Sequence, residues 1–414
     1  MNGDPAPQGQ DASPQLARRI GLPLLILYGM GVTIGAGIYV LIGETTARAG
    51  TYGPTSFLVA AVIMAFSAAS FAELCGRVPR AAGEALYVAS AFHRPWLTLA
   101  TGGLVLLAAI VAAATISLGS AGYMSELIPL PRSVLTVGVV GFTAALAAWG
   151  IRESVIFAAV LTLVEITGLL AIIGLGFWTQ PDIMSHIPQV VPPLSSGSGW
   201  SAVLAASLLA FFAFIGFDDT VNLAEESPNP ERLIPWAIAI TLVIVTALYF
   251  LVSLVAVTTL SAQELQSSNA PVALLYEKLT GASPVAITLI GVFATLNGVV
   301  IQIIMASRVL YGLASSGHLP KGLGRINSAT QTPVFATTLV AAVIVVLVLL
   351  FPLEGLAEMT STVILVVFML VNLALVRIKL TGVRPPANAV EVPLIAPVLG
   401  AITCIFLMIG PRLL

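Results

Sequence analysis

Residues 29–37 read Gly-Met-Gly-Val-Thr-Ile-Gly-Ala-Gly, and this stretch lies inside the first long apolar run of the chain. Four glycines in nine positions weaken a helix, because glycine loses more conformational freedom on folding than any other residue. The stretch 211–219, Phe-Phe-Ala-Phe-Ile-Gly-Phe-Asp-Asp, places two carboxylates after a glycine within the sixth apolar run. The two runs stand five helices apart in the order of spans, with four spans between them, so they enter a membrane from opposite sides. Interrupted segments at matching positions of two oppositely inserted halves indicate the site of an inverted-repeat transporter.

The composition predicts a membrane protein. Of 414 residues, 58% are hydrophobic and only 9% are charged, and the mean hydropathy is +1.03. Soluble domains carry about 25% charged residues because their surfaces face water. We therefore expect lipid to cover most of this surface, in an all-α integral membrane fold. About eleven apolar stretches have a length suited to a bilayer: 22–43, 54–75, 96–121, 134–150, 154–178, 200–224, 234–258, 284–312, 333–351, 357–377 and 392–411.

Other functional classes find little support in the sequence. The balance of 17 basic and 19 acidic residues argues against a nucleic-acid-binding protein. Cys75 and Cys404 lie far apart and the three histidines are scattered, so we expect neither a disulfide framework nor a metal site. Walker, nucleophile-elbow and HExxH motifs are missing from the sequence. We therefore expect a protein that is not an enzyme and uses no cofactor.

The chain divides into three predicted parts. Residues 1–20 are polar and rich in Pro and Gln, which predicts a disordered cytoplasmic N-terminus. Residues 21–382 form the core, with two inverted five-helix repeats over about 21–180 and 198–380, and residues 383–414 add one transmembrane helix. With the N-terminus in the cytoplasm, the outer side holds only Arg48, Arg132, Lys278 and Arg412. The positive-inside rule favours this orientation, in a multi-pass protein of the cytoplasmic membrane.

Gly35, Ala36 and Gly37 allow two interpretations. Small residues in membrane helices commonly let two helices pack closely. Alternatively, an unwound stretch frees backbone N–H groups next to the positive end of the following half-helix, which makes a receptor for a carboxylate. The density of glycine, together with the interruption of the sixth span, favours the second interpretation. We therefore predict that the first span is unwound here and binds a substrate.

Three carboxylates lie at membrane depth. Ionisable groups inside membrane spans are costly and usually functional. Asp218 and Asp219 either titrate during transport or lie at a helix end, where one of them caps the second half-helix. Glu165, in the fifth span, either carries a coupling proton or is a protonated acid that hydrogen-bonds a neighbouring helix. In the eighth span, Thr295, Asn297 and Gln302 either line a pathway or join helices.

Four longer motifs stand out: GMGVTIGAGIYVLIG (29–43), FAELCGRVPRAAGEALYVASAF (71–92), FFAFIGFDDTVNLAEESPNPERLIPWAI (211–238) and ASRVLYGLASSGHLPKGLGRIN (306–327). Together they resemble the amino acid–polyamine–organocation (APC) superfamily, near its cationic amino acid transporter branch. They stand in the family's order, and the resemblance covers nearly all of residues 20–411. It implies a LeuT-like 5+5 inverted-repeat fold and an amino-acid substrate.

The resemblance also implies roles for individual residues. Main-chain groups of Thr33, Gly35, Ala36 and Gly37 would hold the substrate carboxylate. Carbonyls of Phe212, Ala213 and Ile215 would meet its amino group, with Phe212 as an aromatic lid. Asp218 falls where many relatives carry an acid, whereas Glu165 stands where proton-coupled relatives carry a lysine. Many relatives also have twelve helices, one more than we predict.

The expected function is therefore secondary transport of an amino acid by alternating access, coupled to protons. The lysine-to-glutamate departure keeps other couplings open, because a carboxylate at position 165 could also complete an oxygen cage for sodium. Uncoupled exchange of amino acids or polyamines is a further alternative. A sensor that binds an amino acid without net transport, or an enzyme on a membrane fold, fits the sequence less well. The sequence leaves the substrate and the oligomeric state open.

Overall fold

The computed structural model describes residues 20–79, 83–149, 155–315, 319–328, 330 and 332–413, and these form helices and connecting loops without a strand. The long helices are α1 (Leu22–Ala49), α2 (Gly53–Arg77), α4 (Pro95–Ser125), α5 (Arg132–Trp149), α6 (Val155–Thr179), α7 (Gly197–Phe212), α8 (Pro230–Thr259), α11 (Val285–Ser315), α12 (Val334–Leu350), α13 (Leu353–Leu380) and α14 (Ile395–Leu413). Each coincides with one predicted apolar stretch. The N-terminal tail and the boundary predicted at 150–153 lie outside the described residues.

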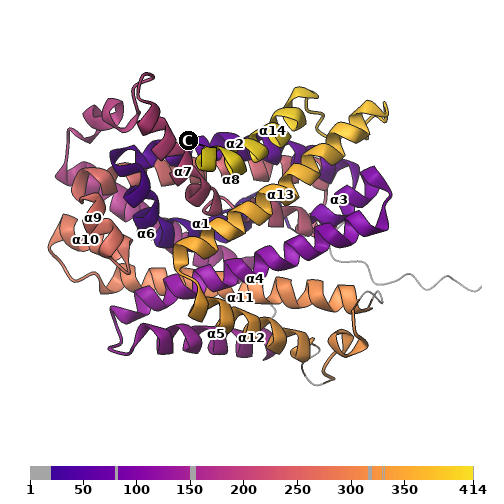
Figure 1. The fold of residues 1–414 in the computed structure, drawn as a ribbon, viewed down its shortest axis with the longest axis horizontal. Coiled ribbons are helices and arrows are strands. Elements are labelled where there is room, and N and C mark those ends of the chain that lie inside the picture. The colour runs from indigo at the N-terminus through magenta and orange to yellow at the C-terminus, as the bar shows by residue number, and fades with distance from the viewer. Residues whose placement is uncertain are drawn as a thin grey trace, which may run out of the picture.

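Shorter elements connect these helices. They are η1 (Gly50–Tyr52), α3 (Gly83–Phe92), η2 (Ile183–Val190), η3 (Phe217–Glu226), α9 (Ala262–Ser267), α10 (Pro271–Thr280) and η4 (Lys321–Gly324). In Figure 1, α9 and α10 lie at one end of the bundle, and α3 lies at the other. We call these the α9 end and the α3 end.

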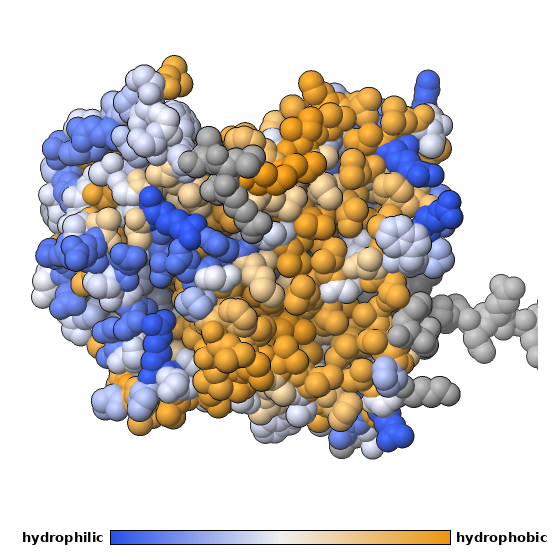
Figure 2. Space-filling view, in the orientation of Figure 1, coloured by the Kyte–Doolittle hydropathy of each residue, from blue (hydrophilic) through white to orange (hydrophobic). Residues whose placement is uncertain are grey.

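The described helices confirm an integral membrane fold. Eight helical stretches are long and apolar enough to cross a membrane, and the first part of α1 (Leu22–Gly35), Val334–Leu350 and Ile395–Gly410 are shorter apolar helical segments. Figure 2 shows hydrophilic residues gathered over the α9 end and a broad apolar surface along the flank of the bundle. That apolar flank has the character of a surface that faces lipid.

The two interrupted spans differ from each other, and one prediction was wrong. The sixth span is broken as predicted, because α7 ends at Phe212 and η3 starts at Phe217. The first span is not unwound, since α1 runs as one α-helix of 28 residues through all four glycines. Its glycines serve close packing. A Cβ at Gly31 would overlap Thr162 of α6, and a Cβ at Gly29 would lie 2.9 Å from Oγ1 of Thr220.

Ion pairs join helices at both ends of the bundle. At the α9 end, Arg48 of α1 pairs with Glu354 and Glu358 of α13. At the α3 end, Glu73 of α2 is fully buried and pairs with Arg77 at 2.7 Å and with Lys379 of α13 at 2.8 Å. The backbone N–H of Val392 donates to Glu73 as well, at 2.8 Å. A buried carboxylate with several charged donors fixes its neighbours, because removing one partner leaves an uncompensated charge.

Candidate functional site

The break after α7 has a local cause at Gly216. The N–H groups of Ala213, Phe214 and Ile215 donate to carbonyls three residues back, at 3.0, 3.0 and 3.1 Å. The i→i−4 hydrogen bonds of the α-helix have therefore already given way to the tighter i→i−3 pattern. Gly216 then adopts φ +124°, which side chains disfavour. Its N–H donates to Oδ1 of Asp218 at 2.9 Å, so the carboxylate satisfies a backbone group that the break exposes. A Cβ on Gly216 would also lie 2.7 Å from Val32 of α1.

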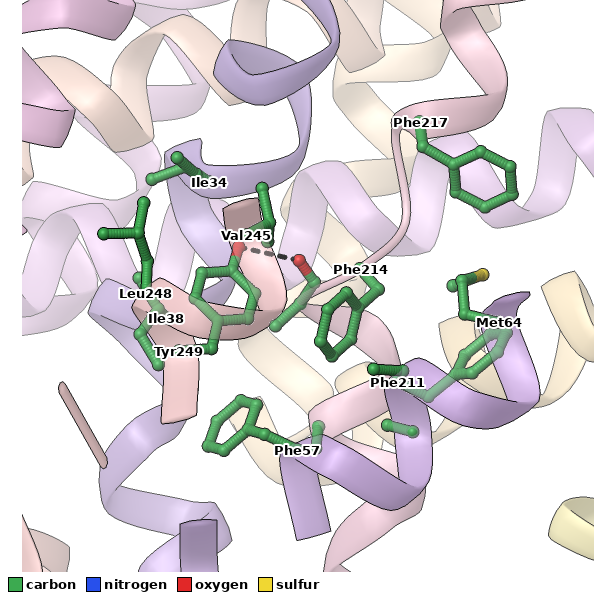
Figure 3. Close-up of a cluster of buried hydrophobic side chains, with 14 of the residues drawn as sticks. Ile34, Ile38, Phe57, Met64, Phe211, Phe214, Phe217, Val245, Leu248 and Tyr249 are labelled. Atoms are coloured by element: carbon green, nitrogen blue, oxygen red, sulfur yellow. Dashed lines mark hydrogen bonds between the residues drawn. The ribbon is translucent and has the colours of Figure 1, made fainter. Parts of the chain in front are cut away.

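The break packs directly against α1. A Cβ added to Gly37 would overlap the backbone of Ala213. The hydroxyl of Tyr249, on α8, lies 2.8 Å from the carbonyl oxygen of Thr33 and 2.9 Å from that of Ala213. The hydroxyl has one hydrogen, so it donates either to both carbonyls at once in a bifurcated bond or to one at a time. The Tyr249 ring packs edge-on against Phe57 and Phe214, which holds this hydroxyl between the two spans (Figure 3).

A small central cavity lies beside this contact. Its volume is about 30 Å³, room for about two water molecules. We call it the central cavity. It is lined from α1 and the α7 break by Gly31, Val32, Thr33, Gly37, Phe212 and Ile215, and from α4 and α11 by Ala112, Ile116, Gly298, Ile301 and Gln302.

The predicted substrate-binding residues divide into two groups. Thr33, Gly37, Phe212 and Ile215 line the central cavity. Ala213 is instead buried against Gly37, and a Cβ on Gly35 would face the Ala294 carbonyl of α11 at 3.5 Å. The side chain of Ala36 lies outside the described residues.

Most of the cavity wall formed by α4 and α11 was not predicted from the sequence. Ala112, Ile116 and Ile301 are apolar residues within long apolar helices, so no sequence signal distinguishes them from residues that face lipid. Gln302 carried a signal, because a polar side chain inside a span needs a partner or a cavity. Thr295 on the same helix bonds the Gly291 carbonyl at 2.7 Å, which is a local role.

A larger cavity opens at the α9 end. Its volume is about 450 Å³, and it is lined in part by Val40, Glu44, Arg132 and Glu354. Arg132 donates to the side-chain oxygen of Asn269 at 2.8 Å, which joins α5 to the loop before α10. Val40 stands one helical turn from Gly37, so the two cavities touch α1 about 5 Å apart along the helix. We call the larger cavity the vestibule.

Glu165 of α6 is buried deep in the protein. The residue is 2% exposed, and neither carboxylate oxygen has a hydrogen-bond partner among the described residues. Its backbone carbonyl accepts from the Tyr39 hydroxyl at 2.9 Å, which fixes this part of α6 against α1. Burying a charge without a partner is far costlier than burying the neutral acid. In this arrangement the side chain is therefore more stable with a proton than without one.

Asp218 has an acidic partner that the sequence did not reveal. Asp218 and Asp219 are 6% and 8% exposed, and the side chain of Glu84, on α3, hydrogen-bonds that of Asp218. Burial, reinforced by the charge of Asp218, raises the pKa of Glu84 well above its usual range. Two carboxyl groups in one buried site do not both ionise readily, because their like charges repel.

Known proteins similar to this chain are membrane transporters. The family model described as amino acid permease matches residues 20–412. The branched-chain amino acid permease BcaP of Bacillus subtilis is 28% identical over 426 residues, 95% of this chain and 88% of the relative. The vacuolar cationic amino acid transporter 4 of Arabidopsis thaliana is 31% identical over 382 residues, 85% of this chain but only 61% of the relative. The cystine/glutamate transporter of Pongo abelii is 28% identical over 435 residues, 98% of this chain and 82% of the relative.

Proposed function

Because this chain belongs to the amino acid permease family, we propose that it is a secondary transporter that moves an amino acid across the cell membrane by alternating access. The central cavity supports this proposal. It lies where α1 meets the broken sixth span, and it holds about 30 Å³, which is too little for an amino acid. Substrate entry then requires the helices around it to move.

We propose further that transport is coupled to protons through Glu165. The observation that carries this is the buried carboxylate without a hydrogen-bond partner among the described residues. Such a group takes a proton when its surroundings are dry and releases it when water reaches it. A conformational cycle that exposes Glu165 to one side of the membrane and then the other would therefore move protons with the substrate.

Sodium coupling has less support. A sodium cage would need several backbone oxygens of α1 turned towards Glu165, but α1 is one continuous helix, so its carbonyls point along the helix axis. Exchange without a coupling ion is an alternative, and similarity to a cystine/glutamate transporter supports it. Asp218, bonded to Glu84, is a second candidate for the proton site.

Uptake into proteoliposomes tests the coupling. With purified protein and a radiolabelled mixture of amino acids, we expect an imposed proton gradient to drive accumulation and a sodium gradient to have no effect. Glu165→Gln imitates the protonated acid, so this variant is expected to exchange substrate but to lose the response to the proton gradient. An unchanged response in Glu165→Gln would exclude this residue, and Asp218→Asn would then be the decisive variant.

Backbone recognition of the substrate has its own test. If the backbone of the α7 break, rather than the continuous helix α1, holds the α-carboxylate and the α-ammonium group, blocking either group removes a charge-assisted contact. That loss is worth about 1.5–3 kcal/mol, or roughly ten- to a hundredfold in affinity. We therefore expect amino-acid amides and N-acetyl amino acids to compete at least tenfold more weakly than the parent. Equal competition would contradict this mode of binding.

A further inference from the structure

The walls of the central cavity carry no ionisable side chain among the described residues that line it. Its polar side chains are those of Thr33 and Gln302. The Thr33 hydroxyl donates to the Gly29 carbonyl at 2.7 Å, so its hydrogen is already used within α1. The amide of Gln302 is neutral, with both donors and an acceptor. A charged group that entered this cavity would meet no opposite charge on the lining side chains.

The wall away from α1 is aliphatic. Ala112 and Ile116 lie one helical turn apart on α4, so they share one face of that helix. Ile301 faces the same cavity from α11, which packs against α4. Ala112 and Ile116 are 4% and 5% exposed. This wall meets the part of a substrate that the backbone of the α7 break does not hold.

We infer that the substrate is an amino acid with an uncharged, aliphatic side chain, and that Ala112, Ile116 and Ile301 set its size. This inference rests on the proposed function. A lysine or arginine side chain would leave its cation unpaired against aliphatic groups, and burying an unpaired charge is strongly unfavourable. An aliphatic side chain gains from each methylene that leaves water. The names of similar proteins point to several substrates, whereas the lining of this cavity favours one class.

Competition measurements on the intact chain test the inference. Reconstituted protein would take up radiolabelled leucine in the presence of unlabelled alanine, valine, isoleucine, lysine, arginine or glutamate. We expect the aliphatic amino acids to compete at least tenfold better than the charged ones. Lysine or arginine competing as well as leucine would overturn the substrate class while leaving amino-acid transport intact. Failure of every amino acid to be transported or bound would instead refute the proposed function.

Variants test the wall itself. Ala112→Leu fills space next to Ile116, so it should weaken leucine uptake at least tenfold and affect alanine less, since one methylene in a tight apolar pocket is worth roughly tenfold or more. The matched control is Ala100→Leu, the same change at an exposed position of α4, which should leave both uptakes unchanged. Gln302→Glu places a carboxylate in the lining with little change of shape, and it should raise the preference for lysine over leucine at least tenfold. Equal effects of Ala112→Leu on leucine and alanine, or an unchanged preference in Gln302→Glu, would contradict the assignment.

Discussion

The first and sixth spans both contain glycine in an apolar run, yet only one of them breaks. In α1, four glycines lie within a continuous helix, and the one at position 37 allows the backbone of Ala213 to approach. In the sixth span, the single Gly216 has φ +124° and a neighbouring Asp218 that accepts its N–H. The comparison shows that the number of glycines does not decide where a membrane helix breaks. A break needs a backbone angle that favours glycine and a nearby group that binds the freed backbone atoms.

The strongest test of this difference is Gly216→Ala. The alanine backbone would have to adopt φ +124°, and its methyl group would lie 2.7 Å from Val32. Backbone strain and overpacking together cost about 2–6 kcal/mol, so we expect the variant to unfold at a much lower temperature or to aggregate on purification. Gly281→Ala is the matched control, because Gly281 also has a positive φ, of +67°, but has open space around it. Thermal unfolding in detergent should show only a small shift for the control.

A second test compares two glycines of α1. Gly37→Ala pushes against the backbone of Ala213, whereas Gly35→Ala meets only ordinary contact at 3.5 Å from Ala294. Overpacking costs about 1–3 kcal/mol, so we expect Gly37→Ala to weaken substrate binding roughly ten- to a hundredfold. Gly35→Ala should stay within about threefold of wild type. Equal losses in both variants, measured as half-saturating concentrations for uptake, would mean that packing against the break is not the role of Gly37.

The hydroxyl between the two spans offers a milder perturbation. Tyr249→Phe removes the donor shared by Thr33 and Ala213 but keeps the ring that packs on Phe57 and Phe214. One buried hydrogen bond is worth about 0.5–1.5 kcal/mol, so we expect a drop of a few degrees in melting temperature and a several-fold change in transport rate. The same substitution at the partly buried Tyr276 of α10, outside the central cavity, serves as the control.

The smallest effect is expected at the α9 end. Hydrogen bonds from the backbone and hydroxyl of Ser261 and from Lys278 lower the pKa of the exposed Glu264 to about 2. A lowered pKa contributes stability that is present above the unfolded value of about 4.5 and is lost as the pH falls towards 2. Between about pH 5 and 8 this contribution is constant. Glu264→Gln should therefore leave the pH profile of transport unchanged, which makes it the control for Glu165→Gln.

The sequence predicted more of the fold than of the site. Length and hydropathy located every long helix, because a bilayer demands about 20 apolar residues of each span. The break at Gly216 was predictable, since carboxylates after a glycine interrupt an apolar run. The continuity of helix α1 was not predictable. Its glycines contact Thr162 and Ala213, and only the tertiary arrangement brings these residues near. Gly35 and Gly37 look equivalent in the sequence but differ in space, since only Gly37 is crowded.

Two parts of the site had no sequence signal. The aliphatic wall of Ala112, Ile116 and Ile301 looks like any lipid-facing surface, because membrane helices are apolar on both faces. The contact between Glu84 and Asp218 joins residues far apart in the chain, and the order of the helices does not reveal it. Glu165 was noticeable because an acid inside a span is costly. Its lack of a partner among the described residues emerged only from the structure.

Cysteine labelling at the central cavity tests most directly whether the substrate binds where α1 meets the break. The native cysteines, Cys75 and Cys404, are both buried and can be replaced by alanine. In that background, Ala112→Cys places a thiol in the central cavity and Ser133→Cys places one in the vestibule. We expect a saturating aliphatic amino acid to protect the central-cavity thiol from a small methanethiosulfonate reagent and to leave the vestibule thiol reactive. Equal labelling of the central-cavity thiol with and without substrate, in protein that still transports that amino acid, would contradict the account.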